Sequence, residues 1–295
     1  MRFLSYGLDA PKIIGYLFVG GLLCATLSVG IYLQWPPVLL IMKGWFLFDS
    51  FKIFYPFYFL IKRDTANFWR RSFLKICQGG FALVMFVGLY QQQIYAYLVA
   101  QVLLIGFSVA FLVPALLMIW SSLVGKRLLR DRLLNLMSWQ GNEKVLDVGC
   151  GRGLMLIGAA RKLTSGKAVG VDVWQKGDLS SNSRSAVVAN IEKAGLAHKA
   201  EVVDGDARSL PFTDSFFDVV LSNFVLHNIP TEVEREQALR EVVRVLKPGG
   251  TVLINDFQYT DQYAAVLKKL GLKEVRRSRL QWLVFPPARW VIGRK

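Results

Sequence analysis

The sequence predicts an all-α membrane region followed by an α/β domain built on a parallel, doubly wound sheet. Two observations lead to this prediction. The 50 residues between Lys75 and Lys126 contain no Asp, Glu, Lys or Arg, and charged residues return at ordinary density after Lys126. From residue 144 onward, a short apolar strand, a glycine-rich turn, an amphipathic helix and a second strand ending in Asp172 follow one another. That order is typical of the nucleotide-binding half of a doubly wound sheet.

The apolar N-terminal region offers four candidate membrane spans, each near the length of about 20 residues that a bilayer requires. The expected spans are residues 13–33, 38–61, 76–91 and 94–120. Pro114 lies inside the last of them, where neighbouring groups can satisfy the freed carbonyl. The second candidate contains Lys43, Asp49 and Lys52. Asp49 and Lys52 share one helix face and can pair, which lowers the cost of burying them. A re-entrant or interfacial second segment, and hence three spans, is the alternative.

The net charge of +15 comes largely from basic clusters that lie where membrane helices would end. These clusters fall in residues 62–75, 126–132 and 268–295. With four spans, all three share one side with the N-terminus, and the positive-inside bias makes that side cytoplasmic. Attraction to anionic lipid headgroups explains the clusters without nucleic acid. We therefore expect a multi-pass protein of a bacterial inner membrane, with the lipid bilayer as its partner and the charged domain in the cytoplasm.

Three cysteines, Cys24, Cys77 and Cys150, lie far apart in the chain. This spacing gives neither a disulfide framework nor a zinc-binding pattern, and it fits a reducing compartment. No metal site is expected.

The turn after the first strand of the α/β domain reads Gly-Cys-Gly-Arg-Gly over residues 149–153. Glycines let the backbone turn sharply and let a ligand approach without a Cβ in the way. The helix that follows directs free N–H groups at the ligand. Asp172 lies about 20 residues further on at the carboxyl end of a strand, where it can accept hydrogen bonds from ribose hydroxyls.

The spacing of these glycines distinguishes two kinds of nucleotide site. A dinucleotide-binding turn has the pattern G-x-G-x-x-G, but here the spacing is G-x-G-x-G and Leu154 occupies the position of the third glycine. The turn resembles motif I of class I S-adenosylmethionine-dependent methyltransferases. Later segments resemble that family's adenine-binding turn, fourth strand and fifth strand in order, at residues 204–207, 210–223 and 246–255. Four ordered motifs favour a methyltransferase over a dehydrogenase.

The resemblance implies a Rossmann-like fold, with a seven-stranded sheet whose last hairpin, residues 273–283 and 289–294, is antiparallel. The expected domains are a membrane region over residues 1–122, a basic linker helix over 123–142 and a methyltransferase domain over 143–295. The cofactor would be S-adenosyl-L-methionine. The residues expected to bind it are Asp147, Gly149, Cys150, Gly151, Gly153, Asp172, Val173, Asp206, Ala207 and Asn223.

Individual roles follow from the same resemblance. The Asp206 carboxylate would take the adenine amino group, and the Ala207 backbone N–H would meet a ring nitrogen. Trp174 either covers the adenine or packs into the long loop after Asp172. Arg152 either reaches the carboxylate of the cofactor or faces solvent.

The segment Phe-Val-Leu-His-Asn-Ile over residues 224–229 is similar to the segment after the fourth strand in quinone C-methyltransferases, and the type 11 and ubiquinone/menaquinone-biosynthesis methyltransferases are the relatives it suggests. His227 departs from the basic residue of those enzymes. It is the candidate catalytic base, and a histidine bound within its own loop is the alternative.

The expected activity is methylation of a hydrophobic, membrane-resident small molecule such as a quinone, isoprenoid or lipid, because the membrane region would hold the active site at the level of the headgroups. Two alternatives stay open. One is a membrane protein that binds the cofactor as a sensor or scaffold without turnover. The other is a transporter-like helical bundle with an accessory methyltransferase domain.

Overall fold

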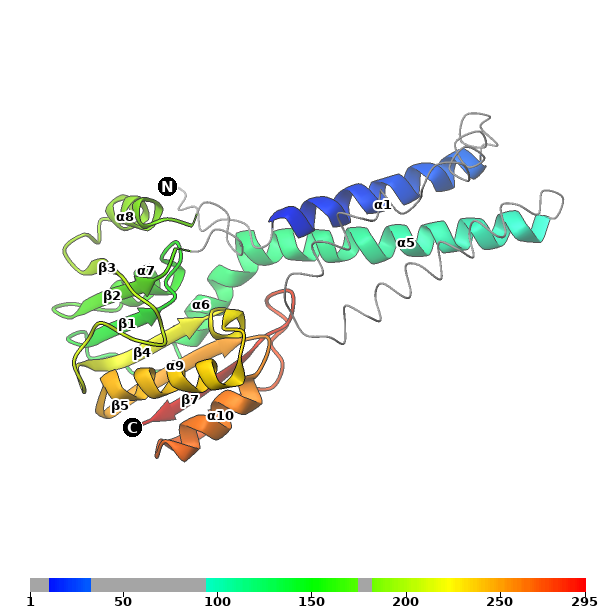
Figure 1. Cartoon of the computed structure of the whole chain (residues 1–295). Helices are drawn as coiled ribbons and strands as arrows, with labels where there is room; N and C mark the ends of the chain where they lie inside the picture. The colour runs from blue at the N-terminus through cyan, green and yellow to red at the C-terminus, as the bar shows by residue number, and fades with distance from the viewer. Residues whose placement is uncertain (1–10, 33–93, 175–181) are drawn as a thin grey trace. The chain divides into compact units, whose positions relative to one another are not determined.

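The computed structural model describes residues 11–32, 94–174 and 182–295 (Figure 1). The described chain divides into two compact units, one ending at Leu116 and one that contains the residues from Leu117 onward.

The first unit contains helix α1 (Pro11–Tyr32) and most of helix α5 (Ile94–Trp120), and these helices match the first and last expected spans. Pro114 lies inside α5, as expected. The two helices share a polar contact: Ser28 Oγ lies 2.5 Å from Gln101 Oε1, and Gln101 Nε2 donates to the Ser28 carbonyl at 2.7 Å. The polar side-chain amide of Gln101, which lies in an apolar helix, thereby has hydrogen-bond partners.

Among the described residues, one helix has the length and composition needed to cross a membrane. The continuous helical stretch Val99–Leu134 is long and apolar enough to cross a bilayer, and the apolar stretch Ile14–Val29 is shorter. The expected spans 38–61 and 76–91 lie outside the described residues. The multi-pass, all-α transmembrane region therefore stays a prediction.

The second unit contains a seven-stranded sheet in the order β3-β2-β1-β4-β5-β7-β6. Strands β1 to β5 pair in parallel, and β7 is antiparallel to both β5 and β6, which confirms the expected fold of the α/β domain. The strands are β1 (Lys144–Val148), β2 (Lys167–Asp172), β3 (Ala200–Asp204), β4 (Phe217–Asn223), β5 (Leu246–Asp256), β6 (Lys273–Arg277) and β7 (Arg289–Arg294).

Helices cover both faces of this sheet, and each face has its own apolar core. One core joins the sheet to α6 (Lys126–Leu134), α7 (Leu154–Ala160) and α8 (Arg184–Lys193). The other joins it to α9 (Glu232–Val245) and α10 (Thr260–Lys269), with Phe217 and Tyr263 fully buried in it. The strands of the parallel part are apolar on both faces because both faces are covered.

The helix before the domain differs from the expected linker over residues 123–142. A π-helical turn, η1 (Ser121–Gly125), follows α5, and α6 ends at Leu134. Leu129 and Leu133 are buried in the core of the sheet, so α6 is part of the domain. The helix stops because Trp139 folds back and its Nε1 donates to the Leu134 carbonyl at 2.8 Å, satisfying an end that has no helical partner.

The closing hairpin is shorter than expected on its first side. Strand β6 ends at Arg277, whereas the sequence pattern suggested a strand to Leu283. Residues 278–288 form a loop instead, closed by an isolated bridge between Gln281 and Ala288. Proline has no N–H to donate to a strand ladder, so Pro286 and Pro287 favour this loop.

Candidate cofactor site

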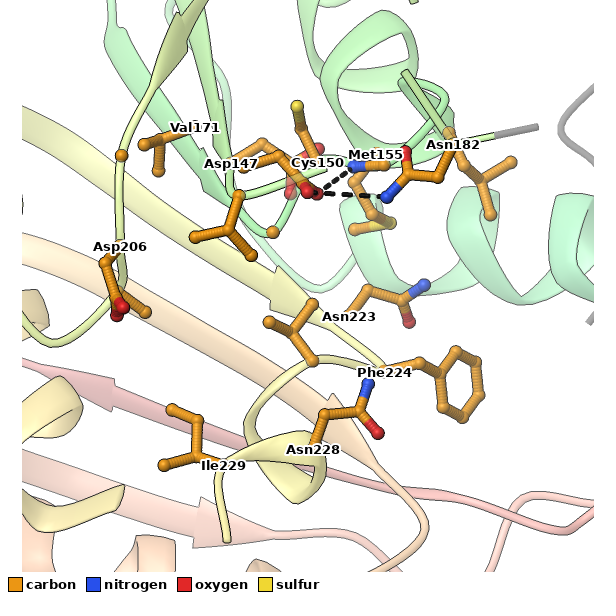
Figure 2. Close-up of a pocket in the computed structure, with 18 of the residues that line it drawn as sticks. Asp147, Cys150, Met155, Val171, Asn182, Asp206, Asn223, Phe224, Asn228 and Ile229 are labelled. Atoms are coloured by element: carbon orange, nitrogen blue, oxygen red, sulfur yellow. Dashed lines mark hydrogen bonds between the residues drawn. The ribbon is translucent and has the colours of Figure 1, made fainter. Parts of the chain in front are cut away.

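A cavity of the second unit lies at the carboxyl ends of β1, β2 and β4. The strand order reverses between β1 and β4, and ligands of open α/β sheets bind at such a switch point. Figure 2 shows two walls facing each other, one with Asp147, Cys150 and Asn182, the other with Asn223 and Asn228.

The glycine turn forms the first wall. Gly149, Gly151 and Gly153 have φ angles of 71°, 51° and 84°, a region that other residues rarely adopt. A Cβ on Gly149 would overlap the Val225 side chain of the opposite wall, so glycine is required there. Gly153 caps α7 and does not line the cavity, while the other residues of the turn do.

Asp147 stabilises the glycine turn through a hydrogen bond to the helix that follows it. Its side chain is buried at the end of β1 and accepts a hydrogen bond from the Leu156 backbone N–H at 2.8 Å. Burial raises the pKa of this carboxyl to about 7, the Leu156 hydrogen bond opposes that rise, and the nearby charge of Asp172 adds to it. Asp147 therefore connects β1 to the helix that follows the turn.

Asp172 organises the same wall from β2. Its carboxylate accepts hydrogen bonds from the Gly151 N–H at 2.8 Å, the Trp174 N–H at 2.6 Å and Asn182 Nδ2 at 3.4 Å. These bonds hold the glycine turn and both ends of the next loop around one carboxylate. Each carboxylate oxygen can accept more than one hydrogen bond, so capacity is left for ligand hydroxyls.

The two residues that follow Asp172 lie differently with respect to the cavity. Val173 is exposed and lines the cavity, as expected. Trp174 does not line it: its Nε1 donates to Asp204 Oδ1 at 2.7 Å. The structure therefore favours the loop-packing interpretation of Trp174 over adenine stacking.

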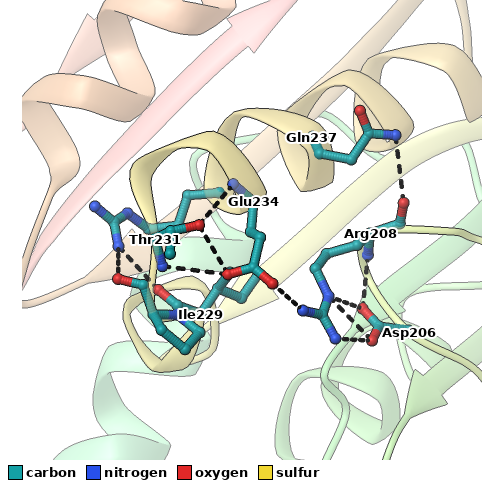
Figure 3. Close-up of polar contacts among 8 residues, drawn as sticks. Asp206, Arg208, Ile229, Thr231, Glu234 and Gln237 are labelled. Carbon is teal, nitrogen blue, oxygen red and sulfur yellow. Dashed lines mark hydrogen bonds and ion pairs between the residues drawn. The ribbon is translucent and has the colours of Figure 1, made fainter. Parts of the chain in front are cut away.

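Asp206 and Ala207 line the far end of the cavity, and Asp206 has a partner that sequence reasoning missed. Arg208 lies between two carboxylates, with its Nη2 2.6 Å from Asp206 Oδ2 and its Nη1 in contact with Glu234 (Figure 3). The hydrogen bond from Arg208 lowers the pKa of Asp206. Glu234 also closes the capping box of α9 with Thr231, so this network connects the far end of the cavity to α9. The Asp-x-Arg spacing at residues 206–208 was the available signal.

The second wall comes from β4, the 3₁₀ turn η2 (Leu226–Asn228) and α6. Asn223 Oδ1 accepts a hydrogen bond from Asn255 Nδ2 at 2.9 Å, which orients the Asn223 amide at the end of β4. Lys126, the first residue of α6, also lines the cavity, with its Nζ 5.3 Å from the Phe224 ring centroid. Sequence reasoning placed Lys126 in a basic cluster and missed this position.

His227 does not line the cavity. Its Nδ1 lies 2.7 Å from Asp256 Oδ1, and its ring lies 4.3 Å from the Phe257 ring centroid. Asp256 is fully buried at the end of β5 and also accepts the backbone N–H of His227. The His227 ring thus lies between Asp256 and Phe257, outside the cavity lining. Its function as a base stays a prediction. Arg152, which is part of the glycine turn, also lines the cavity.

The fold and the site resemble those of class I S-adenosylmethionine-dependent methyltransferases. Residues 146–254 match the sequence profile of the family described as a methyltransferase domain. Among named relatives, the chloroplastic 2-phytyl-1,4-beta-naphthoquinone methyltransferase of Arabidopsis thaliana is 39% identical over 132 residues, which are 42% of this chain and 47% of that protein. A demethylmenaquinone methyltransferase of Lactobacillus johnsonii is 33% identical over 144 residues, 48% of this chain and 54% of that protein.

The chain spans about half the length of these curated relatives. A crystal structure of an S-adenosylmethionine-dependent methyltransferase from Aquifex aeolicus is similar to 61% of this chain and 97% of its own, with 20% identity and a TM-score of 0.47.

Proposed function

We propose that this protein is a membrane-anchored S-adenosylmethionine-dependent methyltransferase that acts on a quinone or a similar hydrophobic molecule of the membrane. The observation that carries the proposal is the meeting of Asp172, the glycine turn and Asn223 in one cavity at the switch point of the sheet. The names of the relatives over the same residues support a quinone as the acceptor.

The residues of the first wall fit the cofactor. The glycine turn lines the cavity at the carboxyl end of β1, and Asp172 lies at the carboxyl end of β2 with hydrogen-bonding capacity for ribose hydroxyls. Asp206 and Ala207 are in position for the adenine end. Asn223, Phe224 and Lys126 then remain for the methionine end and the acceptor.

The chain contributes mainly placement and exclusion of water. S-adenosylmethionine supplies a methyl group already activated on a sulfonium, so holding the acceptor in line with it provides most of the rate. Phe224, Val225 and Ile229 give the second wall an apolar surface suited to a quinone ring. Where the acceptor must lose a proton, His227 is the proposed base. Its Nδ1 lies 2.7 Å from Asp256 Oδ1, and Nε2 is the nitrogen that we propose takes the proton.

Anchoring would supply the acceptor at high effective concentration. The apolar helical stretch Val99–Leu134 supports it, because this stretch runs without a break into α6, which is packed in the domain core. The multi-pass topology and cytoplasmic orientation rest on the charge pattern of the sequence.

The proposal is tested with the purified full chain in lipid nanodiscs, given labelled methyl donor and a demethylated quinol. We expect repeated turnover with label in the lipid extract, and loss of turnover in Asp172→Ala. Cofactor binding without turnover would show a sensor or scaffold, and label confined to protein or water-soluble products would refute the lipid acceptor. His227→Ala with full turnover would remove the base from the mechanism.

A further inference from the structure

The loop between β6 and β7, residues 278–288, packs against the helical turn η1 that follows α5. The Phe285 backbone N–H donates to Ser121 Oγ at 3.1 Å. A Cβ on Gly125 would overlap the Leu283 carbonyl, so the backbones approach as closely as glycine allows. Val284 is buried and anchors the loop in the domain core. The position of this loop is therefore fixed by contacts.

Trp282 projects from this loop away from the domain core. Its side chain is 73% exposed, although it lies two residues from the buried Val284. The adjoining helix also presents large apolar side chains: Trp120, Leu123, Val124 and Leu128 are between 41% and 51% exposed. Grouped exposed apolar residues of this size mark an interaction site more often than single ones do. We call these five residues the Trp282 surface.

The surroundings of the Trp282 surface are positively charged. Residues 276–289 contain four arginines and no acidic residue. Residues 120–132 contain four basic residues and one acidic residue, Asp131, which pairs with Arg130. Tryptophan flanked by arginine is typical of the bilayer interface, where the ring sits at headgroup depth and the cations meet anionic lipid.

We propose that the Trp282 surface rests on an anionic lipid headgroup layer, so that the methyltransferase domain itself contacts the membrane next to the end of the apolar helix. A lipid surface is favoured over a second copy of the chain because two copies would bring like charges together. It is also favoured because η1 continues directly from a helix of 27 residues without a charged side chain. This inference rests on the anchoring part of the proposed function and not on methyl transfer.

The contact would also place the cavity. Lys126 lines the cavity and lies in the chain between Val124 and Leu128 of the Trp282 surface. Helix residues two apart lie on opposite sides, so a domain resting on this surface would hold its second wall about one helix diameter, roughly 10 Å, from the headgroups. An acceptor dissolved in the bilayer could then reach the cavity over a short path.

The test uses the full chain in vesicles that contain anionic phospholipid and a phospholipid with a photoactivatable headgroup. Trypsin cuts after Arg279 and Arg289, so residues 280–289 form one peptide with Trp282 as its only tryptophan. We expect lipid adducts on this peptide well above those at Val233 of α9, which is 78% exposed and serves as the internal control. Adducts no more frequent than at Val233 would overturn the proposal. Cross-links between two copies through residues 280–289 in place of lipid adducts would also overturn it.

Three variants sharpen the result. Trp282→Ser should abolish the excess of adducts, and Val233→Ser should leave it unchanged. Arg279→Gln removes one cleavage site, so its adducts are read on residues 278–289. It should lower the excess about fivefold in anionic vesicles and have no effect in neutral ones, because one cation near an anionic surface contributes about 1 kcal/mol. An Arg279→Gln effect of equal size in neutral vesicles would contradict the electrostatic part. The adducts form without methyl donor or acceptor, so their absence and an absence of turnover are separate results.

Discussion

The two walls of the cavity are held in different ways. The first wall is fixed by carboxylates on backbone N–H groups, Asp147 on Leu156 and Asp172 on Gly151 and Trp174. The second wall combines side chains from β4, η2 and α6, with Asn255 orienting Asn223 and Lys126 near the ring of Phe224.

This difference separates a cofactor wall from an acceptor wall. Backbone N–H groups are present whatever the side chains are, so the first wall is suited to a ligand that does not change. The second wall can change with single substitutions in three separate segments. We therefore expect substitutions in the first wall to weaken cofactor binding and those in the second to alter acceptor selection.

The largest effect is expected for Asp172→Ala. The substitution leaves the Gly151 and Trp174 N–H groups without their acceptor and removes the proposed ribose contact. Hydrogen bonds to charged groups contribute about 1.5–3 kcal/mol each, so S-adenosylmethionine affinity should fall about 100-fold. Equilibrium binding of labelled cofactor measures it. Asp204→Ala, on the neighbouring strand, is the matched control. It should change cofactor affinity less than threefold, equivalent to less than about 0.7 kcal/mol.

Gly149→Ala tests whether the two walls are coupled. The added Cβ meets the Val225 side chain and the position keeps a φ of 71°, so the variant should lose about 1–3 kcal/mol of stability. Val225→Ala removes the two Cγ atoms that come closest but keeps the Cβ at 2.9 Å, so it should relieve most of the overlap and none of the backbone strain. We expect the melting temperature of the double variant to lie between those of Gly149→Ala and the parent protein. A double variant as unstable as Gly149→Ala alone would show that the walls do not press on each other at this point.

The first wall could be predicted from the sequence because its residues lie within one strand–turn–helix–strand unit. The positions of Asp147, the glycine turn and Asp172 follow from local motif spacing, and the structure brings them together as expected. Gly153 was predicted as a ligand residue but caps α7, since a motif does not show which of its glycines serve the turn alone.

The second wall could not be predicted in the same way. Lys126 and Asn228 lie about 100 residues apart in the chain, and no local pattern joins them. Arg208 was missed because pairing across the loop to Glu234 depends on the packing of α9. His227 illustrates the same limit: its place after the fourth strand suggested the cavity, but the buried Asp256 carboxylate holds its ring.

Lys126→Ala tests the assignment of the second wall. We expect the KM for the acceptor to rise or kcat to fall about tenfold, equivalent to about 1.4 kcal/mol. Cofactor affinity should change little, because the first wall is untouched. Steady-state kinetics with acceptor varied at saturating cofactor measures it, and Arg127→Ala is the control for a lost basic residue. A tenfold loss of cofactor affinity in Lys126→Ala would instead place this lysine with the cofactor.

The last prediction concerns the pH dependence of stability through Asp147. Burial raises the pKa of this carboxyl from 3.8 to about 7, so between these pH values the folded protein binds more protons than the unfolded chain. Stability should therefore fall as pH rises across this window, with a slope of at most about 1.4 kcal/mol per pH unit from this group. Asp147→Asn keeps an oxygen for the Leu156 N–H and cannot ionise, so it should flatten that slope. Melting temperatures of the parent protein and the variant from pH 5 to 8 measure the difference. Parallel curves would show that Asp147 stays ionised in the folded protein and that the hydrogen bond from Leu156 outweighs its burial.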